Sequence, residues 1–353
     1  MSAPLPDLHD QPDVYDRPAA VSPALRLTRW WRLAAIVVAV VALAVVGLRG
    51  RFPDPREFVA ALAGAGYGWV ALAALLQAVS LAAFAFQQRR LLENLGVRLR
   101  RRRVMAITLA RSALSISLPA GAAVSTGYAI REYRRAGVTR KIGAASAIVS
   151  GLASIGGLTL LYVIGGAGVV AQHPGTFLNW RPLTIVVGIA TLTAGAVAIG
   201  RRHAARPDRE PAGERQIPYG RVGRQVARLL TAARGAWRAG ASLRVRDWAA
   251  ALAYAALNWL TDLLCLAAAA RALGLPVGVT TLAGIYLGVQ IVRQVPLTPG
   301  GVGVVETALV AGLTAAGATA ISAAAAVLVY RLLSCWLIIP AGGIAAVALR
   351  RGR

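Results

Sequence analysis

The sequence Pro-Leu-Thr-Pro-Gly-Gly-Val-Gly occupies residues 296–303 and interrupts an apolar segment that runs from 281 to 315. Two prolines and three glycines among eight residues are incompatible with a regular helix. We expect helical structure to resume at Val304, after the last of these glycines. Inside a membrane, non-helical backbone is tolerated only where protein surrounds it or where it lines a cavity. The segment therefore predicts two helices joined by a break that is packed within a membrane protein.

The composition of the 353-residue chain is that of a membrane protein. Hydrophobic residues make up 57% of it and charged residues 15%, and its mean hydropathy is +0.60. Soluble domains have about 45–50% apolar and roughly 25% charged residues, and disordered chains are poor in apolar residues. The net charge of +25 would suit a nucleic-acid partner. The apolar content argues instead for arginines at a membrane surface, so we expect no nucleic acid to bind.

Six apolar runs are long enough for transmembrane helices, which need about 20 residues. They are residues 33–48, 67–86, 144–170, 183–200, 248–270 and 318–349. With the N-terminus in the cytoplasm, 31 of the 39 Lys and Arg residues lie on the cytoplasmic side and five outside. This asymmetry follows the positive-inside rule and places the C-terminus in the cytoplasm of a multi-pass inner-membrane protein. Two shorter apolar segments, 104–130 and 281–315, then enter and leave on one side, as re-entrant hairpins or pairs of short helices.

Several segments lie outside these spans. Residues 1–29 are predicted to form a disordered cytoplasmic tail, and 30–349 the membrane domain. The basic loop 201–246 carries apolar residues at helical spacing over 219–240, with arginines between them. This pattern predicts an interfacial helix on the anionic cytoplasmic leaflet, with a solvated basic loop as the alternative. The histidines are scattered and Cys265 and Cys335 lie within spans, so we expect no metal, no cofactor and no disulfide framework.

The chain contains an internal repeat. Leu-Pro-Ala-Gly at 118–121 aligns with Thr-Pro-Gly-Gly at 298–301, and 136–139 aligns with 316–319 at the same offset of 180 residues. The repeated unit occurs at about 67–170 and about 248–349. The charge distribution places the two copies in opposite orientations, an arrangement found in many secondary transporters. Chance similarity between two Ala- and Gly-rich stretches is the alternative.

Five ionisable residues lie at membrane depth: Arg111, Asp262, Arg293, Glu306 and Arg331. Each costs about 2.5–3.5 kcal/mol at the centre of a span, so such residues are expected to be paired or functional. They form either buried ion pairs that hold helices together or a polar path for a charged substrate. Three arginines against two acids leave one positive charge, which suits a phosphate group.

Polar groups near these charges extend the candidate site. Asn258 lies one helical turn before Asp262, so both are expected on one face of their span. A helix that begins at Val304 directs free N–H groups toward Gly300 and Gly301, and such a terminus attracts anions. Glu306, in the first turn of that helix, could instead cap it. The equivalent part of the first copy offers the hydroxyl groups of Ser115 and Ser117 rather than charges.

These motifs resemble the flippase-like transmembrane region of lysylphosphatidylglycerol synthases. The resemblance covers about residues 30–349 and rests on the motifs at Arg111–Gly121, Gly127-Tyr128, Arg131-Glu132, 296–306 and Tyr330-Arg331. It implies a role like that of the bifunctional multiple peptide resistance factors, in which this region is thought to move aminoacylated phosphatidylglycerol between leaflets. The soluble domain that attaches the amino acid has no counterpart here, so synthase activity is expected to be absent. The resemblance extends to proteins linked with polyprenyl-phosphate sugars.

We predict an all-α integral membrane protein with six transmembrane helices and two Pro/Gly-broken re-entrant hairpins in an inverted repeat. The predicted function is a lipid flippase or transporter that moves or binds an anionic phospholipid or a polyprenyl-phosphate lipid. The alternative is a non-transporting partner that anchors a glycosyltransferase or a lipid-modifying enzyme. The predicted substrate-binding residues are Arg111, Ser115, Ser117, Pro119, Gly121, Asn258, Asp262, Arg293, Thr298, Pro299, Gly300, Gly301, Glu306, Tyr330 and Arg331.

Overall fold

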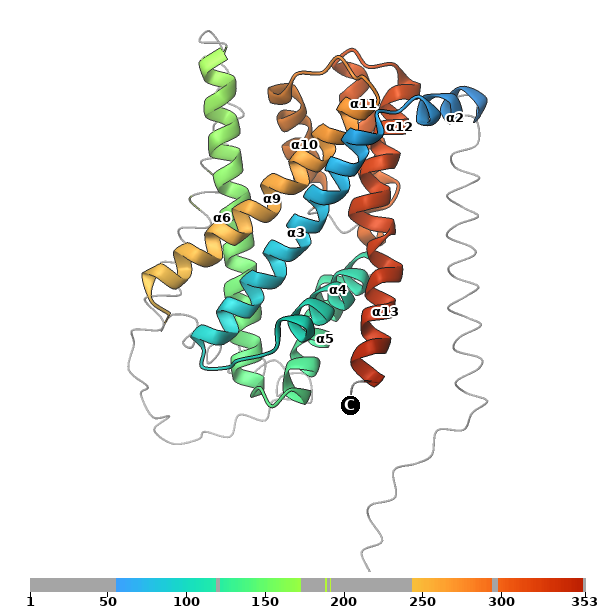
Figure 1. The fold of residues 1–353 in the computed structure, drawn as a ribbon. Coiled ribbons are helices and arrows are strands. Elements are labelled where there is room, and N and C mark those ends of the chain that lie inside the picture. Colours follow the sequence, from blue (N-terminus) through green and yellow to red (C-terminus); the bar gives the residue numbers. More distant parts are fainter. Residues whose placement is uncertain are drawn as a thin grey trace, which may run out of the picture. The chain divides into compact units, whose positions relative to one another are not determined.

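A computed structural model describes residues 55–118, 121–172, 188, 191, 243–293 and 298–351, all within the unit Pro53–Arg353. Within these residues the structure is helical, with no strand (Figure 1). The predicted spans at 33–48 and 183–200, the tail 1–29 and the interfacial helix at 219–240 fall outside the described residues, apart from two isolated positions in 183–200. The helices are α2 (Pro55–Ala63), α3 (Tyr67–Asn94), α4 (Arg101–Ser117), α5 (Gly121–Arg135), α6 (Arg140–Gln172), α9 (Val245–Ala272), α10 (Val279–Arg293), α11 (Val304–Ala315), α12 (Ala320–Arg331) and α13 (Ile338–Arg351).

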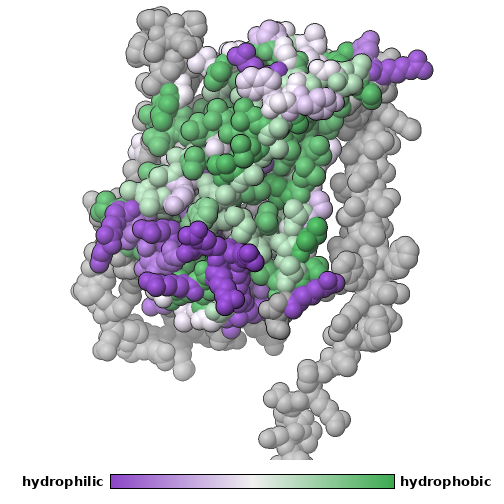
Figure 2. Space-filling model, viewed as in Figure 1, coloured by the Kyte–Doolittle hydropathy of each residue, from purple (hydrophilic) through white to green (hydrophobic). Residues whose placement is uncertain are grey.

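Among the described residues, four helical segments are long and apolar enough to cross a membrane. They are Tyr67–Asn94, Arg140–Gly165, Val245–Ala272 and Ala320–Arg351. Four of the six predicted runs thus form helices of spanning length, although α3 continues to Asn94 instead of ending at residue 86. Large apolar side chains on these segments face outward, as they do in a helix that contacts lipid, and examples are Leu75, Ile164 and Ile344. Figure 2 shows the result as a broad apolar band across the middle of the unit.

Arginines gather at one end of the unit, where α3 ends, α4 begins and α13 ends. We call this the basic end, and it is the hydrophilic region below the apolar band in Figure 2. It includes Arg89 and Arg90 on α3, the run Arg100–Arg103 and Arg350 on α13. Clustered arginines at one end of apolar helices are typical of the interface between hydrocarbon and water.

The helix boundaries of the two sequence repeats correspond. Helices α3 and α9 each have 28 residues, and their first residues are 178 positions apart. Helices α5 and α11 both end one residue before a turn that contains a glycine with positive φ, at Gly137 and Gly317. The same hydrogen bond closes each turn, from Val138 N to Tyr133 O and from Ala318 N to Leu313 O. The aligned sequences Ala-Gly-Val-Thr at 136–139 and Ala-Gly-Ala-Thr at 316–319 therefore form the same turn.

Helices α3 and α9 pack side by side and run in opposite directions (Figure 1). The amino end of α3 meets the carboxyl end of α9, where Gly66 N donates to Ala272 O at 2.8 Å. Helix α4 therefore starts at the basic end, and α10 starts at the opposite end. Each begins a pair of short helices, α4–α5 and α10–α11, which matches the predicted helix–break–helix units.

Helices α12 and α13 form one long segment with a wider turn between them. Residues Leu332–Trp336 adopt a π-helical turn, and Leu337 N donates to Leu332 O at 2.9 Å. Pro340 explains this turn, because proline has no N–H to donate to the carbonyl of Trp336 and its ring crowds that carbonyl. Such π turns often occur at functional sites. The turn begins directly after Arg331.

Candidate functional site

The break of the second copy lies against the helix end that precedes the break of the first copy. The turn η2 (Pro299–Gly301) packs against the carboxyl end of α4. A Cβ atom on Gly300 would lie 2.7 Å from the carbonyl oxygen of Ile116, and the φ of Gly300 is +61°. Only glycine fits this position, because any side chain would overlap the backbone of α4 and strain its own. The turn of the second copy therefore contacts the last turn of α4, directly before the break of the first copy.

The break of the first copy is equally tight. A Cβ atom on Gly121 would lie 2.1 Å from the carbonyl oxygen of Ser115, so the chain can reverse between α4 and α5 only with glycine there. Pro119 falls outside the described residues. Ser115 is partly buried, whereas Ser117 is exposed.

Arg331 forms hydrogen bonds both to the turn at Gly300 and to Glu306 of α11. Its Nε donates to Glu306 Oε1 at 2.6 Å, and its Nη2 donates to the carbonyl oxygen of Gly300 at 3.2 Å. The Arg331 side chain is 2% exposed and that of Glu306 is 24% exposed. The ion pair thus has one buried member and one member that is accessible from outside.

Glu306 also caps α11. Its Oε2 accepts a hydrogen bond from Gly303 N at 2.7 Å. The carboxylate therefore stands at the positive end of the helix, where it is stabilised by the helix dipole. This geometry agrees with the alternative in which Glu306 caps the helix that begins at Val304. An anionic substrate group that approached this terminus would have to compete with Glu306 for Arg331 and Gly303.

Asp262 forms a second polar cluster with two tyrosines. Its Oδ2 accepts hydrogen bonds from Tyr286 Oη at 2.7 Å and from Tyr330 Oη at 3.0 Å. Arg293, at the end of α10, interacts electrostatically with Asp262 and both tyrosines, and its side chain is exposed. Tyr330 directly precedes Arg331, so the two clusters share α12. A buried carboxylate is thereby held by two neutral donors and a nearby positive charge.

Arg111 carries the unpaired positive charge that the count of ionisable residues predicts. Its guanidinium lies 5.1 Å from the centre of the Phe84 ring, which is a cation–π distance. No carboxylate of the described residues forms an ion pair with it, and its buried Nη1 has no hydrogen-bond partner. Arg111 precedes Ile116 by five residues, roughly 7.5 Å along α4. It therefore lies close to the level of the contact between the two breaks.

The polar side chain of Tyr133 acts on Arg111. The two groups interact electrostatically, and the buried hydroxyl of Tyr133 also lacks a hydrogen-bond partner. Burial raises the pKa of Tyr133 to about 12, so its phenol is a neutral donor at physiological pH. Arg111 and Tyr133 together offer two hydrogen-bond donors to an oxyanion.

Other predicted site residues serve the packing of helices. Asn258 does not join Asp262, because its amide hydrogen-bonds to Ser80 of α3. The side chains of Asn258 and Asp262, one turn apart on α9, thus contact different neighbouring helices. Thr298 begins the turn: its carbonyl accepts from Gly301 N at 3.1 Å, and its buried hydroxyl has no hydrogen-bond partner. Pro299 is the first residue of η2.

One buried polar network was not predicted from the sequence. Gln87 and Gln88, at the basic end of α3, contact Ser146 and Ser150 of α6 through hydrogen bonds between side chains. Gln87 Nε2 also donates to the carbonyl of Ala251 on α9 at 2.9 Å. They lie beyond the predicted span, because the apolar run ends at residue 86. Two adjacent glutamines directly after an apolar run were the available signal that the helix continued.

A pocket of about 470 Å³ lies between α4, α5 and α13. Tyr128, Arg131 and Arg350 line it, and so does Ser117 from the carboxyl end of α4. The Arg131 guanidinium lies 5.3 Å from the centre of the Tyr128 ring. The pocket thus connects basic side chains with the tip of the first hairpin.

Residues 25–342 match the family described as lysylphosphatidylglycerol synthase TM region. The chain belongs to this family. The match includes every residue of the predicted site and both breaks, and it confirms the resemblance that the motifs indicated. Among curated proteins, none matches the chain. A lysylphosphatidylglycerol synthase TM region with four apolar helices of spanning length is a membrane protein.

Proposed function

We propose that this protein binds an anionic lipid at membrane depth and moves it between the leaflets of the cytoplasmic membrane. The observation that carries the proposal is the buried Arg331, which links Glu306 to the break at Gly300. A charged group at this depth is costly unless it stabilises the fold or meets a substrate. The family points to a lipid, either an aminoacyl-phosphatidylglycerol-like phospholipid or a polyprenyl-phosphate lipid. We do not expect lysyltransferase activity.

The proposed architecture has six transmembrane helices and two re-entrant hairpins in an inverted repeat, with both termini in the cytoplasm. Two observations support the repeat: the corresponding boundaries of α3 and α9, and the contact of η2 with the carboxyl end of α4. In such repeats, broken helices meet near the midplane and one half moves against the other around a substrate site. The hairpins α4–α5 and α10–α11 would approach the midplane from opposite sides.

In the proposed mechanism the lipid phosphate takes the place of Glu306 beside Arg331. A guanidinium can bind a phosphate through two hydrogen bonds, as it binds a carboxylate. Displacing the Glu306 carboxylate releases Gly303 N and the amino end of α11, which lies next to the break. Arg111 supplies the positive charge that no described acid balances. Glu306 and Asp262 would then be available to a cationic part of the headgroup.

A leaflet-exposure assay in proteoliposomes tests this function. The full chain is reconstituted with fluorescent phosphatidylglycerol, and the fraction accessible to an external quencher is followed over time. We expect Arg331→Ala and Glu306→Gln to slow lipid movement at least tenfold. The matched controls are Arg271→Ala and Glu57→Gln, which alter exposed charges away from the breaks. Unchanged lipid movement in Arg331→Ala and Glu306→Gln would overturn the proposed site.

The alternative function is that of a membrane partner that anchors a glycosyltransferase or a lipid-modifying enzyme. The observation that favours it is the strongly basic segment 201–246, with twelve arginines. In that case, deletion of 201–246 abolishes the function of the partner enzyme and leaves lipid movement unaffected. Loss of lipid movement on the same deletion argues against it.

A further inference from the structure

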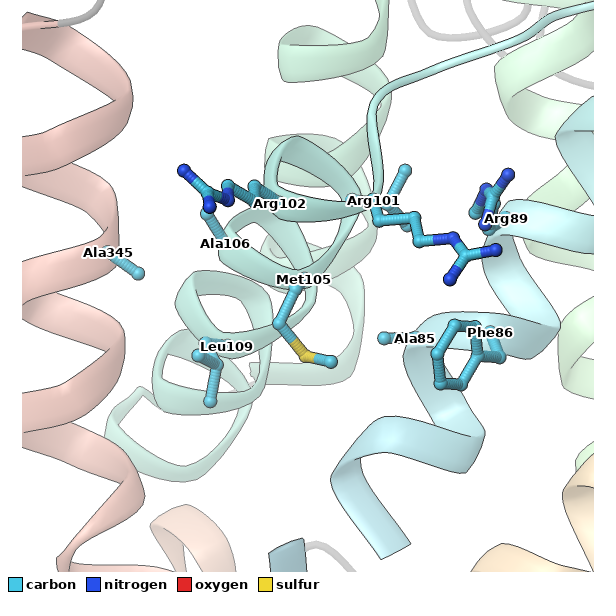
Figure 3. Close-up of a pocket in the computed structure, with 10 residues that line it drawn as sticks. Ala85, Phe86, Arg89, Arg101, Arg102, Met105, Ala106, Leu109 and Ala345 are labelled. Atoms are coloured by element: carbon cyan, nitrogen blue, oxygen red, sulfur yellow. The ribbon is translucent and has the colours of Figure 1, made fainter. Parts of the chain in front are cut away.

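A groove of about 400 Å³ lies between α3, α4 and α13 at the basic end (Figure 3). Its floor is apolar and is formed by Ala85, Phe86, Val104, Met105, Ala106, Leu109 and Ala345. Figure 3 shows Met105 directed from α4 into the space beside Phe86, and Leu109 on the side of α4 toward α13. The groove therefore offers an apolar surface just inside the interface between hydrocarbon and water.

Three arginines line the basic end of this groove: Arg89, Arg101 and Arg102. Arg101 extends from the start of α4 toward Arg89 and Phe86 in Figure 3, whereas Arg102 extends toward α13. Arg101 and Arg102 are exposed and form no ion pair with the described residues. Arg89 pairs with Glu93 through Nη2 at 2.7 Å, but its buried Nε has no hydrogen-bond partner. No acidic residue lines the groove.

We propose that this groove binds a phospholipid with an anionic headgroup from the leaflet at the basic end. By the positive-inside rule this leaflet faces the cytoplasm. An acyl chain lies along Phe86, Met105 and Leu109. The phosphate lies between Arg101 and Arg89, toward which Arg101 extends, and Arg102 adds a positive charge on the side of α13. The charge complementarity selects an anionic over a zwitterionic headgroup, because the three arginines have one acidic partner among them. The site is separate from the Arg331–Glu306 pair and does not depend on transport.

Photo-crosslinking tests this proposal on the full chain in phosphatidylcholine vesicles. The probe is phosphatidylglycerol with a diazirine on one acyl chain, and the readout is its attachment to the peptide that contains Met105 and Leu109. Arg101→Gln with Arg102→Gln should lower this attachment at least tenfold, since each basic residue near an anionic surface contributes roughly a fivefold effect. The matched control, Arg98→Gln with Arg100→Gln, removes the same charge from exposed neighbours that do not line the groove. It should retain the attachment.

A second pair of variants separates the groove from general surface charge. Ala106→Trp fills the floor of the groove without changing the charge and should block the attachment. Ala78→Trp adds the same bulk at an exposed position of α3 and should not. Equal attachment of the phosphatidylglycerol probe and a phosphatidylcholine probe would overturn the proposal, and so would equal losses in the two double variants. Free inorganic phosphate should not compete, because it lacks the acyl chain.

The photo-crosslinking result at the groove does not depend on whether the protein moves lipid between leaflets. Arg331→Ala should lose lipid movement and retain the attachment at the groove. If lipid movement is absent and the attachment persists, the groove stands as a binding site. If the attachment fails while Arg331→Ala still slows lipid movement, the groove proposal alone is wrong.

Discussion

Ser80 and Asn258 hydrogen-bond to each other across the α3–α9 contact, and they lie 178 residues apart in the chain. Asn258 Nδ2 donates to Ser80 O at 2.9 Å and to Ser80 Oγ at 2.7 Å, and Ser80 Oγ donates to Asn258 O at 3.1 Å. The same separation relates the first residues of α3 and α9. A residue that contacts its own counterpart lies next to the axis that relates the two copies. The proposed repeat therefore has its axis at this pair.

Removing the Ser80–Asn258 pair should loosen the two halves. Asn258→Ala is expected to lower the free energy of unfolding by about 1 kcal/mol, since polar pairs between membrane helices contribute about 0.6 kcal/mol on average and up to about 1.7 kcal/mol. Thermal unfolding of Asn258→Ala, Ser80→Ala and the double variant in detergent measures the coupling. Additive losses would show that the two side chains act independently. Thr159→Ala, whose hydroxyl donates to the carbonyl of Ile155 in its own helix α6, is the control.

Gly300→Ala should disrupt the contact between the two breaks. The added methyl group would overlap the carbonyl of Ile116, and a positive φ costs about 1–2 kcal/mol for a residue other than glycine. We expect reduced thermal stability together with slower lipid movement. Gly288→Ala is the matched control, because a Cβ there meets nothing within 4 Å and the residue lies inside α10. Equal behaviour of the two variants would contradict the close approach.

The Arg331–Glu306 pair should show strong coupling. Removing one partner of a buried pair costs about 3–5 kcal/mol, and partial exposure of Glu306 reduces this cost. Glu306→Gln should therefore be less stable than the double variant Glu306→Gln with Arg331→Gln, in which no charge is left uncompensated. Unfolding and lipid movement are measured on the same samples. Recovery of both in the double variant would mean that the pair is structural, whereas recovery of stability alone supports contact with the substrate.

Gly342→Ala should separate α13 from α4. A Cβ on Gly342 would lie 2.4 Å from the Cβ of Ala113 and 2.5 Å from the carbonyl oxygen of Leu109, both on α4. Overpacking of this kind typically costs about 1–3 kcal/mol. The neighbouring Gly343→Ala is the control, since a Cβ there meets nothing within 4 Å. A melting temperature that falls equally in both variants would exclude the helix contact as the cause.

Features that depend on composition over a few residues were predictable from the sequence. Four apolar spans, the interruption at 296–303 and the start of α11 at Val304 agree with the structure, because hydrophobicity, proline and glycine act locally. The carboxyl end of α3 was not predicted. Gln87, Gln88 and Arg89 are polar, yet their helix continues because its polar side chains find partners on α6, α9 and α3 itself.

Pairings between distant residues needed the tertiary structure. The sequence predicts that five ionisable residues lie at membrane depth, since each charge carries a solvation cost wherever it is buried. They are Arg111, Asp262, Arg293, Glu306 and Arg331, three arginines against two acids, so one positive charge is left without an acidic partner. It does not predict that Glu306 pairs with Arg331 or that Asp262 binds two tyrosines, because these contacts depend on how α9, α10, α11 and α12 pack. Nor does it predict the groove beside Arg101, which three helices form together. Local chemistry determines which segments enter the membrane, and packing determines which polar groups meet there.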